Sequence, residues 1–323
     1  MTLAVLCGGV GAARFLRASA GVWPAAHTTA VVNTGDDTVL HGLSISPDLD
    51  TITYTLADAI DADRGWGLRN ESWRAMEALV RYADGRPTGS TAAPTWFNLG
   101  DRDLATHLYR TARLAEGATL TTVTAEISAA WGLVQRLLPM SDGRVTTMVS
   151  LFEERIEVPF QEYFVQRRHD VPVAGVRFDG AAAASLTAAA AAALSDSDGV
   201  VIAPSNPLVS IAPIRALNGV DARLAARRDS VVAVSPIVGG MALKGPADRM
   251  MSELGIEPSV VGVARLYAPI ASTLVIDPVD EHLSSAVEAA GIRALVVPSV
   301  MSSSPQVAHD LAFHTLRAAG LHP

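Results

Sequence analysis

The segment TLAVLCGGVGAAR, residues 2–14, joins a short apolar run to a glycine-rich turn and the start of a helix. Thr2–Cys7 has the composition of a buried strand, and Ala12–Ala18 reads as the helix that follows it. Glycines at such a turn let the backbone approach a phosphate, which the free amides at the start of the helix then bind. The segment is not a P-loop, because the Lys-Ser/Thr pair is missing, and Arg14 replaces the third small residue of a dinucleotide fingerprint. We predict a phosphate-binding loop at Gly8–Gly11, with an ordinary tight turn as the alternative.

Six further apolar runs resemble the first one and are separated by stretches of helical pattern. They are Thr28–Asn33, Gly199–Ala203, Ser230–Val234, Ser259–Val263, Ser272–Ile276 and Ala294–Val297. Continuous apolar runs of this length indicate strands of a parallel sheet that helices cover on both faces. The predicted fold is α/β, a doubly wound, mainly parallel Rossmann-like sheet that binds its ligands at the carboxyl ends of the strands.

The middle of the chain has a different pattern. Residues 58–131 read mainly as helix, and residues 144–165 alternate between apolar and polar side chains, as in a β-hairpin or a pair of edge strands. We therefore predict a nucleotide-binding core made of residues 1–57 and 196–323. A mostly helical insertion with a β-hairpin, residues 58–195, interrupts this core.

Composition restricts the classes of function. The chain has 323 residues, 49% of them hydrophobic, and a formal net charge of −8, so no basic surface for nucleic acid is expected. Its only cysteine, Cys7, excludes an internal disulfide and fits a reducing cytoplasm. The start of the chain lacks the pattern of a signal peptide, and the apolar run at 181–194 is too short to span a bilayer. We expect a cytoplasmic protein without a membrane or nucleic-acid partner.

Four aspartates lie within fifteen residues after the second apolar run, among glycine, proline and serine that mark loops. They are Asp36, Asp37, Asp48 and Asp50. So many carboxylates repel one another unless a cation lies between them, and Mg²⁺ prefers carboxylate oxygens and bridges to substrate phosphates. The pattern favours magnesium and phosphate chemistry, while capping of turns or helices is the alternative.

Two polar turns follow strands in the second half of the chain. Pro204–Pro207 and Ser235–Gly240 each hold prolines that keep the turn extended, which leaves Ser205 and Asn206 free to bind a nucleotide base or ribose. Ordinary turn chemistry is the alternative for either segment alone.

Aromatic rings adjoin a charged cluster at residues 96–103, WFNLGDRD. Trp96 and Phe97 can cover a flat ring system, and Arg102 can donate to a carbonyl or phosphate. Asp101 is alternatively an N-cap of the following helix. On that helix, His107 is more typical of a structural histidine than of a catalyst.

Seven motifs occur in the order that is typical of the 2-phospho-L-lactate transferase family. They are LCGGVGAARFL, VVNTGDD, HGLSISPDLDTITYTLA, WFNLGDRDLATHLYRT, LPMSDGRVTT, APSNPLVSIAPI and SPIVGG. The resemblance covers nearly the whole chain, although the loop at 85–94 is longer than the family requires. It implies a homodimeric enzyme of coenzyme F420 biosynthesis. Such an enzyme joins a guanosine-diphosphate-activated lactyl or enolpyruvyl phosphate to Fo, 7,8-didemethyl-8-hydroxy-5-deazariboflavin, and releases GMP.

The resemblance also implies roles for individual residues. Asp36 and Asp50 would hold Mg²⁺, with Asp37 and Asp48 in support. The Fo ring and its substituents would contact Asp50, Trp96, Phe97, Asp101 and Arg102. The nucleotide half of the donor would contact Gly8, Gly9, Val10, Gly11, Arg14, Ser205, Asn206, Pro236 and Gly239. No motif distinguishes a lactyl from an enolpyruvyl group.

Two other functions share part of this pattern. A non-enzymatic regulator that binds nucleotide-sugars would share the glycine loop but would not need the GDRDLATH segment. A nicotinamide-dependent oxidoreductase would need one carboxylate for a ribose hydroxyl, not four clustered aspartates.

Overall fold

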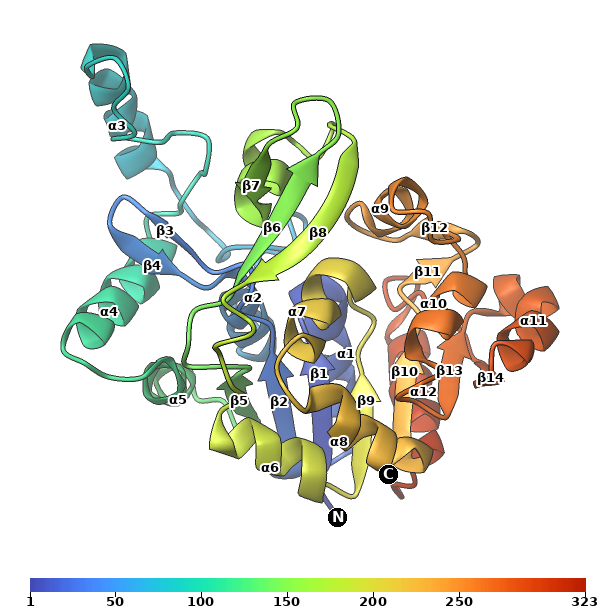
Figure 1. The fold of residues 1–323 in the computed structure, drawn as a ribbon. Coiled ribbons are helices and arrows are strands. Elements are labelled where there is room, and N and C mark those ends of the chain that lie inside the picture. The colour runs from blue at the N-terminus through green and yellow to red at the C-terminus, as the bar shows by residue number, and fades with distance from the viewer.

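A parallel sheet of seven strands forms the centre of the computed structural model, which describes residues 1–323 (Figure 1). From edge to edge the strands are β5 (Arg136–Pro139), β2 (Thr28–Val32), β1 (Leu3–Cys7), β9 (Gly199–Ile202), β10 (Val231–Val234), β13 (Thr273–Ile276) and β14 (Arg293–Val296). Every neighbouring pair is parallel. The predicted doubly wound α/β fold is confirmed.

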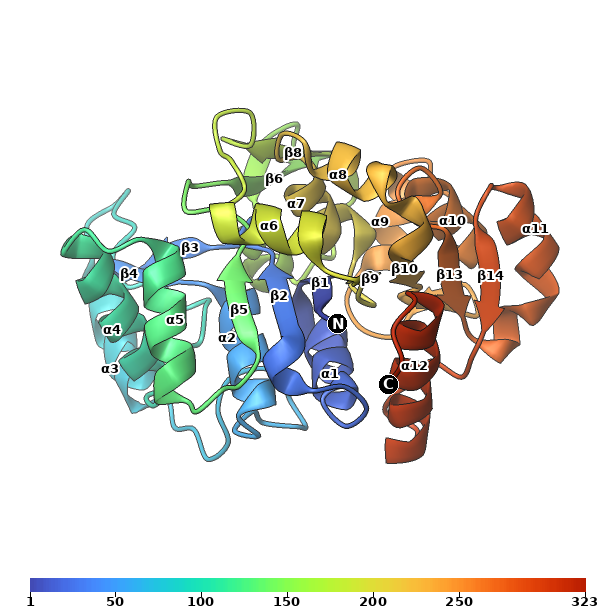
Figure 2. The same cartoon turned by 90° about the horizontal axis from the view of Figure 1, so that it is seen from below.

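Helices cover both faces of this sheet, as the apolar runs require. Alternate residues of β1 belong to different clusters, with Leu3 and Val5 packed on one face and Ala4 and Leu6 on the other. The first face is covered by α1 (Gly9–Ser19), α2 (Pro47–Leu56) and α12 (Pro305–Ala318), and the second by α6 (Ala188–Asp196), α8 (Val220–Ala226) and α10 (Val260–Tyr267). Figure 2 shows these two layers on opposite sides of the strands.

One predicted strand is wrong. Residues 259–263 do not pair with the sheet but begin α10, where the Ser259 hydroxyl accepts hydrogen bonds from the amides of Val261 and Gly262 at 3.1 and 3.3 Å. The first turn of α10 is fully buried, so this run has no polar position that would reveal a helical period. Their β-branched character resembles a strand, whereas the N-cap serine is the signal that marks the helix.

The expected insertion is not one continuous segment. Its residues 136–139 form β5, which pairs with β2 at the edge of the main sheet. Before β5 lie the helices α3 (Arg74–Gly85), α4 (Asp103–Ala115) and α5 (Leu120–Ala130). After β5 lies a separate antiparallel sheet, in the order β7 (Glu157–Pro159), β6 (Thr146–Leu151) and β8 (Val173–Asp179). This sheet has one strand more than the predicted hairpin.

The smaller elements complete the upper side of the molecule in Figure 1. The hairpin of β3 (Thr38–Leu40) and β4 (Leu43–Ile45) connects β2 to α2, and α3 projects away from the body beyond it. The hairpin of β11 (Ile237–Val238) and β12 (Met241–Ala242) leads into α9 (Ala247–Glu253), and α11 (Ser284–Ala289) lies beside β14. None of the helices combines the length and apolar character that crossing a bilayer requires.

The side on which the chain adds strands to the sheet reverses between β1 and β9. From β1 the chain adds β2 and β5 on one side, and it later adds β9, β10, β13 and β14 on the other. The loops that follow β1 and β9 therefore part at this point, where open α/β sheets bind their ligands. They stay in close contact at their bases, because a Cβ added at Gly11 would lie only 2.2 Å from the carbonyl oxygen of Pro204.

Replacement of Gly11 by alanine should therefore destabilise the protein. Because the new Cβ meets a backbone atom that cannot rotate away, we expect the free energy of unfolding in urea to fall by about 1–3 kcal/mol. Gly85→Ala is the matched control, since a Cβ at Gly85 has no atom within 4 Å. Equal stability of the two variants would contradict the close approach of the β1 and β9 loops.

Candidate functional site

A cavity of about 780 Å³ lies at the switch point of the sheet. Its floor includes the glycine loop Gly8–Gly11 after β1 and the turn Pro204–Asn206 after β9. Its walls come from the start of α2, from α4, from the segment after β7 and from the loop between β12 and α9. The predicted convergence of the glycine loop and the aspartate segment in one site is therefore observed.

The glycine loop is fixed by the neighbouring β9 turn. The backbone amide of Gly8 donates to Ser205 Oγ at 3.2 Å, and this hydroxyl donates back to the carbonyl oxygen of Gly8 at 2.9 Å. Gly8 has no room for a side chain, since a Cβ there would lie 2.5 Å from Asp48 Oδ2. The loop thus holds its backbone close to the carboxylates of α2.

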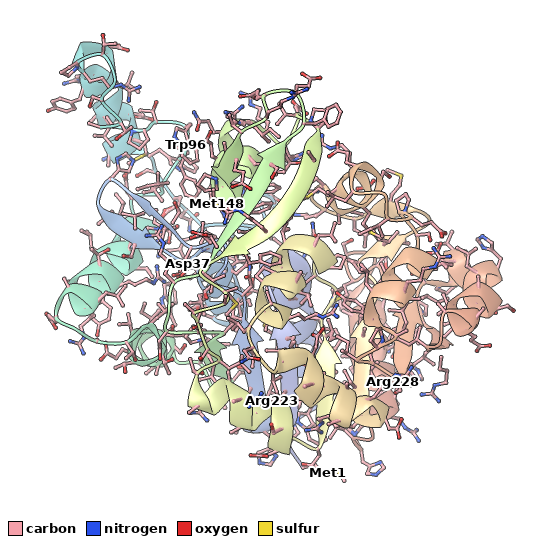
Figure 3. The ribbon with its side chains drawn as sticks, viewed as in Figure 1. Met1, Asp37, Trp96, Met148, Arg223 and Arg228 are labelled. Atoms are coloured by element: carbon pink, nitrogen blue, oxygen red, sulfur yellow. The ribbon has the colours of Figure 1, made fainter.

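The four aspartates are not all loop residues. Asp36 and Asp37 lie in the turn after β2, but Asp48 and Asp50 belong to the first turn of α2, which proline opens at Pro47. Acidic side chains at a helix N-terminus interact favourably with the helix dipole. Figure 3 shows Asp37 where the β3–β4 hairpin meets the lower end of the β6–β8 sheet.

Asp36, Asp37 and Asp48 form a buried acidic cluster. Burial raises the pKa of Asp36 well above its usual value, and the charges of Asp48 and Asp37 raise it further. Burial also raises the pKa of Asp37 to about 8 and that of Asp48 to about 6. Asn33 Nδ2 donates to Asp48 Oδ2 at 2.9 Å, but Asp36 Oδ1 and Asp37 Oδ1 are buried without a hydrogen-bond partner. This cluster therefore has unused oxygen ligands and a strong tendency to attract a cation or protons.

Asp50 belongs to a second group, which links α2 to α4. Both of its oxygens accept hydrogen bonds from the guanidinium of Arg110, which is only 2% exposed. His107 lies between two carboxylates, with Nδ1 3.7 Å from Asp50 Oδ2 and Nε2 3.4 Å from Asp103 Oδ2. The Tyr54 hydroxyl completes the group by donating to Asp103 Oδ1 at 2.5 Å. We call these five residues the α2–α4 network.

The α2–α4 network changes the expected grouping of the carboxylates. Asp50, Asp103 and His107 offer ligand atoms that all lie within 4.8 Å of one another, and this group excludes Asp36. The guanidinium of Arg110 already supplies a positive charge to Asp50. A cation therefore fits the acidic cluster more directly than it fits Asp50.

Most of the residues expected to contact ligands line the cavity. They are Gly8, Gly9, Val10, Gly11, Arg14, Asp36, Asp48, Asp50, Phe97, Ser205, Asn206 and Pro236. Ser205 uses its hydroxyl to hold Gly8, and Asn206 Oδ1 accepts from the amide of Leu208 at 2.9 Å, so neither side chain is as free as predicted.

Five expected contacts lie outside the cavity lining, namely Asp37, Trp96, Asp101, Arg102 and Gly239. Asp101 caps α3, because its carboxylate accepts from the backbone amides of Arg74 and Ala75. Arg102 Nη1 donates to the carbonyl oxygen of Arg69 at 2.6 Å, and neither residue belongs to the cavity lining. Trp96 packs in the small hydrophobic cluster below α3, and Figure 3 shows it displaced toward that helix.

The structure also adds cavity residues that were not among the expected ligand contacts, including His107, which the sequence had favoured as a structural histidine. Asp103 and His107 stand four residues apart, which places both on one face of α4. Phe160, Phe164 and His169 form a stacked row, with ring centroids 5.3 and 5.2 Å apart. Phe164 of this row lies in a π-helical turn, Glu162–Gln166. Such turns are frequent at functional sites and have no simple sequence signature.

The topology and the cavity define a Rossmann-like α/β protein that combines a phosphate-type glycine loop with buried carboxylates. A model of the family described as 2-phospho-L-lactate transferase CofD matches residues 3–320. The chain belongs to this family, and it is a transferase of coenzyme F420 biosynthesis.

Relatives with curated names support the assignment over the full length. The chain is 39% identical to the phosphoenolpyruvate transferase of Mycobacterium avium (strain 104) in an alignment 350 positions long that covers 100% of both chains. It is 40% identical to the phosphoenolpyruvate transferase of Kitasatospora aureofaciens over 306 residues, covering 94% of this chain and 93% of that one. The crystal structure of a UPF0052 family protein from Bacillus halodurans has the same fold, with a TM-score of 0.60, 14% identity and 98% coverage of both chains.

Replacement of Arg110 by methionine should test the α2–α4 network. Because Asp50 then stays buried without its counter-ion, we expect the free energy of unfolding in urea, with divalent metals chelated, to fall by about 3–5 kcal/mol. Addition of Asp50→Asn to this variant removes the uncompensated charge and should recover part of the loss. Arg81→Met at an exposed site of α3 is the control, expected within about 0.5 kcal/mol of the wild type. A double variant no more stable than Arg110→Met would exclude charge as the cause.

Proposed function

We propose that the protein transfers a phosphoenolpyruvyl group from a guanosine-diphosphate-activated donor to the ribityl 5′-hydroxyl of Fo and releases GMP. The observation that carries this proposal is the junction, in one cavity, of a phosphate-type glycine loop with a buried acidic cluster. The names of the relatives at 39–40% identity support enolpyruvyl rather than lactyl as the transferred group. The proposal includes a homodimer acting in the cytoplasm, as the family resemblance implies.

The acidic cluster fits the magnesium ion that this chemistry uses. Asp36 presents an unpartnered buried oxygen, and its neighbours Asp37 and Asp48 share the excess negative charge that raises its pKa. Hard oxygen ligands of this kind suit Mg²⁺. We propose Asp36 as the first ligand with Asp48 beside it. Asp50 would join as a ligand through a remaining lone pair of its carboxylate, while it keeps its ion pair with Arg110. The bound ion would supply charge neutralisation at the diphosphate.

The residues of the chain would contribute positioning and electrostatics, which phosphoryl transfer needs more than covalent chemistry. The Fo hydroxyl oxygen would form a bond to the phosphorus that carries the enolpyruvyl group, as the bond from that phosphorus to the bridging oxygen of GMP breaks. One of the cavity carboxylates would take the hydroxyl proton. The amides at the start of α1 would hold the diphosphate, whereas the amide of Gly8 is already bound to Ser205 Oγ.

The acceptor would occupy the part of the cavity near α4. Phe97 lines this part and offers an apolar surface to the ring, while Asp50 and its network would position the polar substituents. Trp96, Asp101 and Arg102 would then act indirectly, by holding the segment that carries Phe97 and the start of α4.

The direct test is incubation of the protein with Fo, Mg²⁺ and the guanylylated phosphoenolpyruvate or phospholactate donor. We expect GMP and a fluorescent coupled product from the enolpyruvyl donor, and loss of both with EDTA. Asp36→Asn should lower kcat by about 100-fold or more and abolish the rise in melting temperature that Mg²⁺ causes in the wild type. Arg81→Met should match the wild type in both assays.

The outcomes separate this proposal from its alternative. A non-enzymatic regulator would bind a nucleotide-sugar tightly without turnover of either donor. Full activity of Asp36→Asn in the presence of EDTA would exclude the proposed metal site, and GMP release only from the phospholactate donor would exclude enolpyruvyl transfer.

A further inference from the structure

Lys244 is the only lysine in the chain, whereas the other 24 basic residues are arginine. It follows β12 on the loop that leads to α9, and it lines the cavity. The side chain is not part of any motif that led to the family. A single ammonium group in a chain that otherwise uses guanidinium groups requires a local explanation.

The Lys244 ammonium and the glycine loop both lie close to Gly65. A Cβ added at Gly65 would lie 2.7 Å from Lys244 Nζ and 3.6 Å from Val10 Cγ1. Gly65 is therefore a neighbour of the lysine and of the loop that follows β1. Three segments that are distant in the sequence meet at this point, and one of them carries the amides expected to bind phosphate.

The charges at this point are not balanced by the protein. Neither Lys244 nor Arg14 forms an ion pair or a side-chain hydrogen bond, although both line the cavity. Arg64 nearby is different, because its Nη1 lies 3.0 Å from Asp61 Oδ2. Partial removal from water lowers the pKa of Lys244, and the positive charge of Arg14 lowers it further. Two unpaired cations that line the same cavity, beside the amides at the start of α1, indicate a site for an anion with more than one charge.

We propose that Lys244 and Arg14 form a two-cation clamp on the diphosphate of the nucleotide, with Lys244 closing over it from the β12–α9 loop. The clamp rests on the proposed function and adds a binding residue to it. As the phosphorus–oxygen bond to GMP breaks, negative charge grows on the departing phosphate, and a cation at this position stabilises it. The lysine ammonium is a compact charge with three donors, whereas arginine presents a wider planar fork, so arginine would not make the same contact beside Gly65.

Calorimetric binding of GDP and of guanosine to the full chain tests the clamp. Lys244→Met should weaken GDP binding by about 10- to 100-fold, because a charge-assisted contact to phosphate is lost. The affinity for guanosine, which lacks phosphates, should stay within about twofold of the wild type. Lys244→Arg should recover GDP binding only in part. Arg81→Met removes the same charge from an exposed site of α3 and should bind GDP as the wild type does.

A second measurement needs no variant. Acetylation of the wild-type protein by an N-hydroxysuccinimide ester can modify one side-chain amine, Lys244, and the terminal amine of Met1, which serves as an internal control. By peptide mass spectrometry, GDP should slow modification of Lys244 but not of Met1, and guanosine should slow neither.

The results distinguish failure of the clamp from failure of the proposed function. If the wild type binds GDP and Lys244→Met binds it equally well, the clamp is wrong and the transferase proposal stands. Equal weakening of GDP and guanosine, or no protection of Lys244 by GDP, also overturns the clamp. If the wild type binds neither compound, the nucleotide half of the proposed function fails together with the clamp.

Discussion

The buried ion pair between Asp50 and Arg110 joins the two halves of the site. Asp50 lies on α2 beside the main sheet, and Arg110 lies on α4, sixty residues later in the chain. A carboxylate and a guanidinium that are almost fully withdrawn from water are tolerated only when each satisfies the other. The pair therefore fixes α4 against the core of the main sheet. His107, Asp103 and the segment carrying Phe97 take their positions from that helix, and so the wall nearest the expected acceptor depends on this one contact.

The cavity has an electrostatic polarity along its floor. Buried carboxylates gather at the turn after β2 and at the start of α2, while Arg14 and Lys244 gather over the glycine loop. A diphosphate is attracted to the second region and repelled by the first. It can approach the carboxylates only with a cation between them, which gives a physical reason for pairing the acidic cluster with a divalent metal. The net charge of −8 does not reveal this separation, because a sum over the chain contains no positions.

The sequence predicted those elements whose evidence lies within their own residues. Continuous apolar runs identified β1, β2, β9, β10, β13 and β14, and the family motifs identified the glycine loop and the aspartates. The strand prediction for residues 259–263 failed because a buried helix start and a buried strand are both apolar over five residues. Only the capping serine distinguishes the two. The loop assignment of Asp48 and Asp50 failed for a related reason, since Pro47 ends a loop but also opens a helix.

Contacts between distant segments were beyond the reach of the sequence. The residues next to Ser205 in the sequence do not show that its hydroxyl bonds to Gly8 rather than to a ligand. The residues next to Asp101 likewise do not show that it caps α3 instead of the helix that follows it. The α2–α4 network and the stacked row of Phe160, Phe164 and His169 likewise depend on which surfaces meet after folding. Lys244 was visible only as a peculiarity of composition.

The division of the middle of the chain by β5 bears on how this enzyme family can diversify. Each excursion from the main sheet starts and ends at an element of the core, one carrying α3 to α5 and the other carrying β6 to β8. Either excursion can lengthen independently, because each doubling of a flexible loop costs only about 0.6 kcal/mol. Both excursions contribute to the cavity wall, while the glycine loop and the β9 turn stay within the sheet. Evolution can thus reshape the wall of the cavity in separate steps while the two loops of the sheet keep their places.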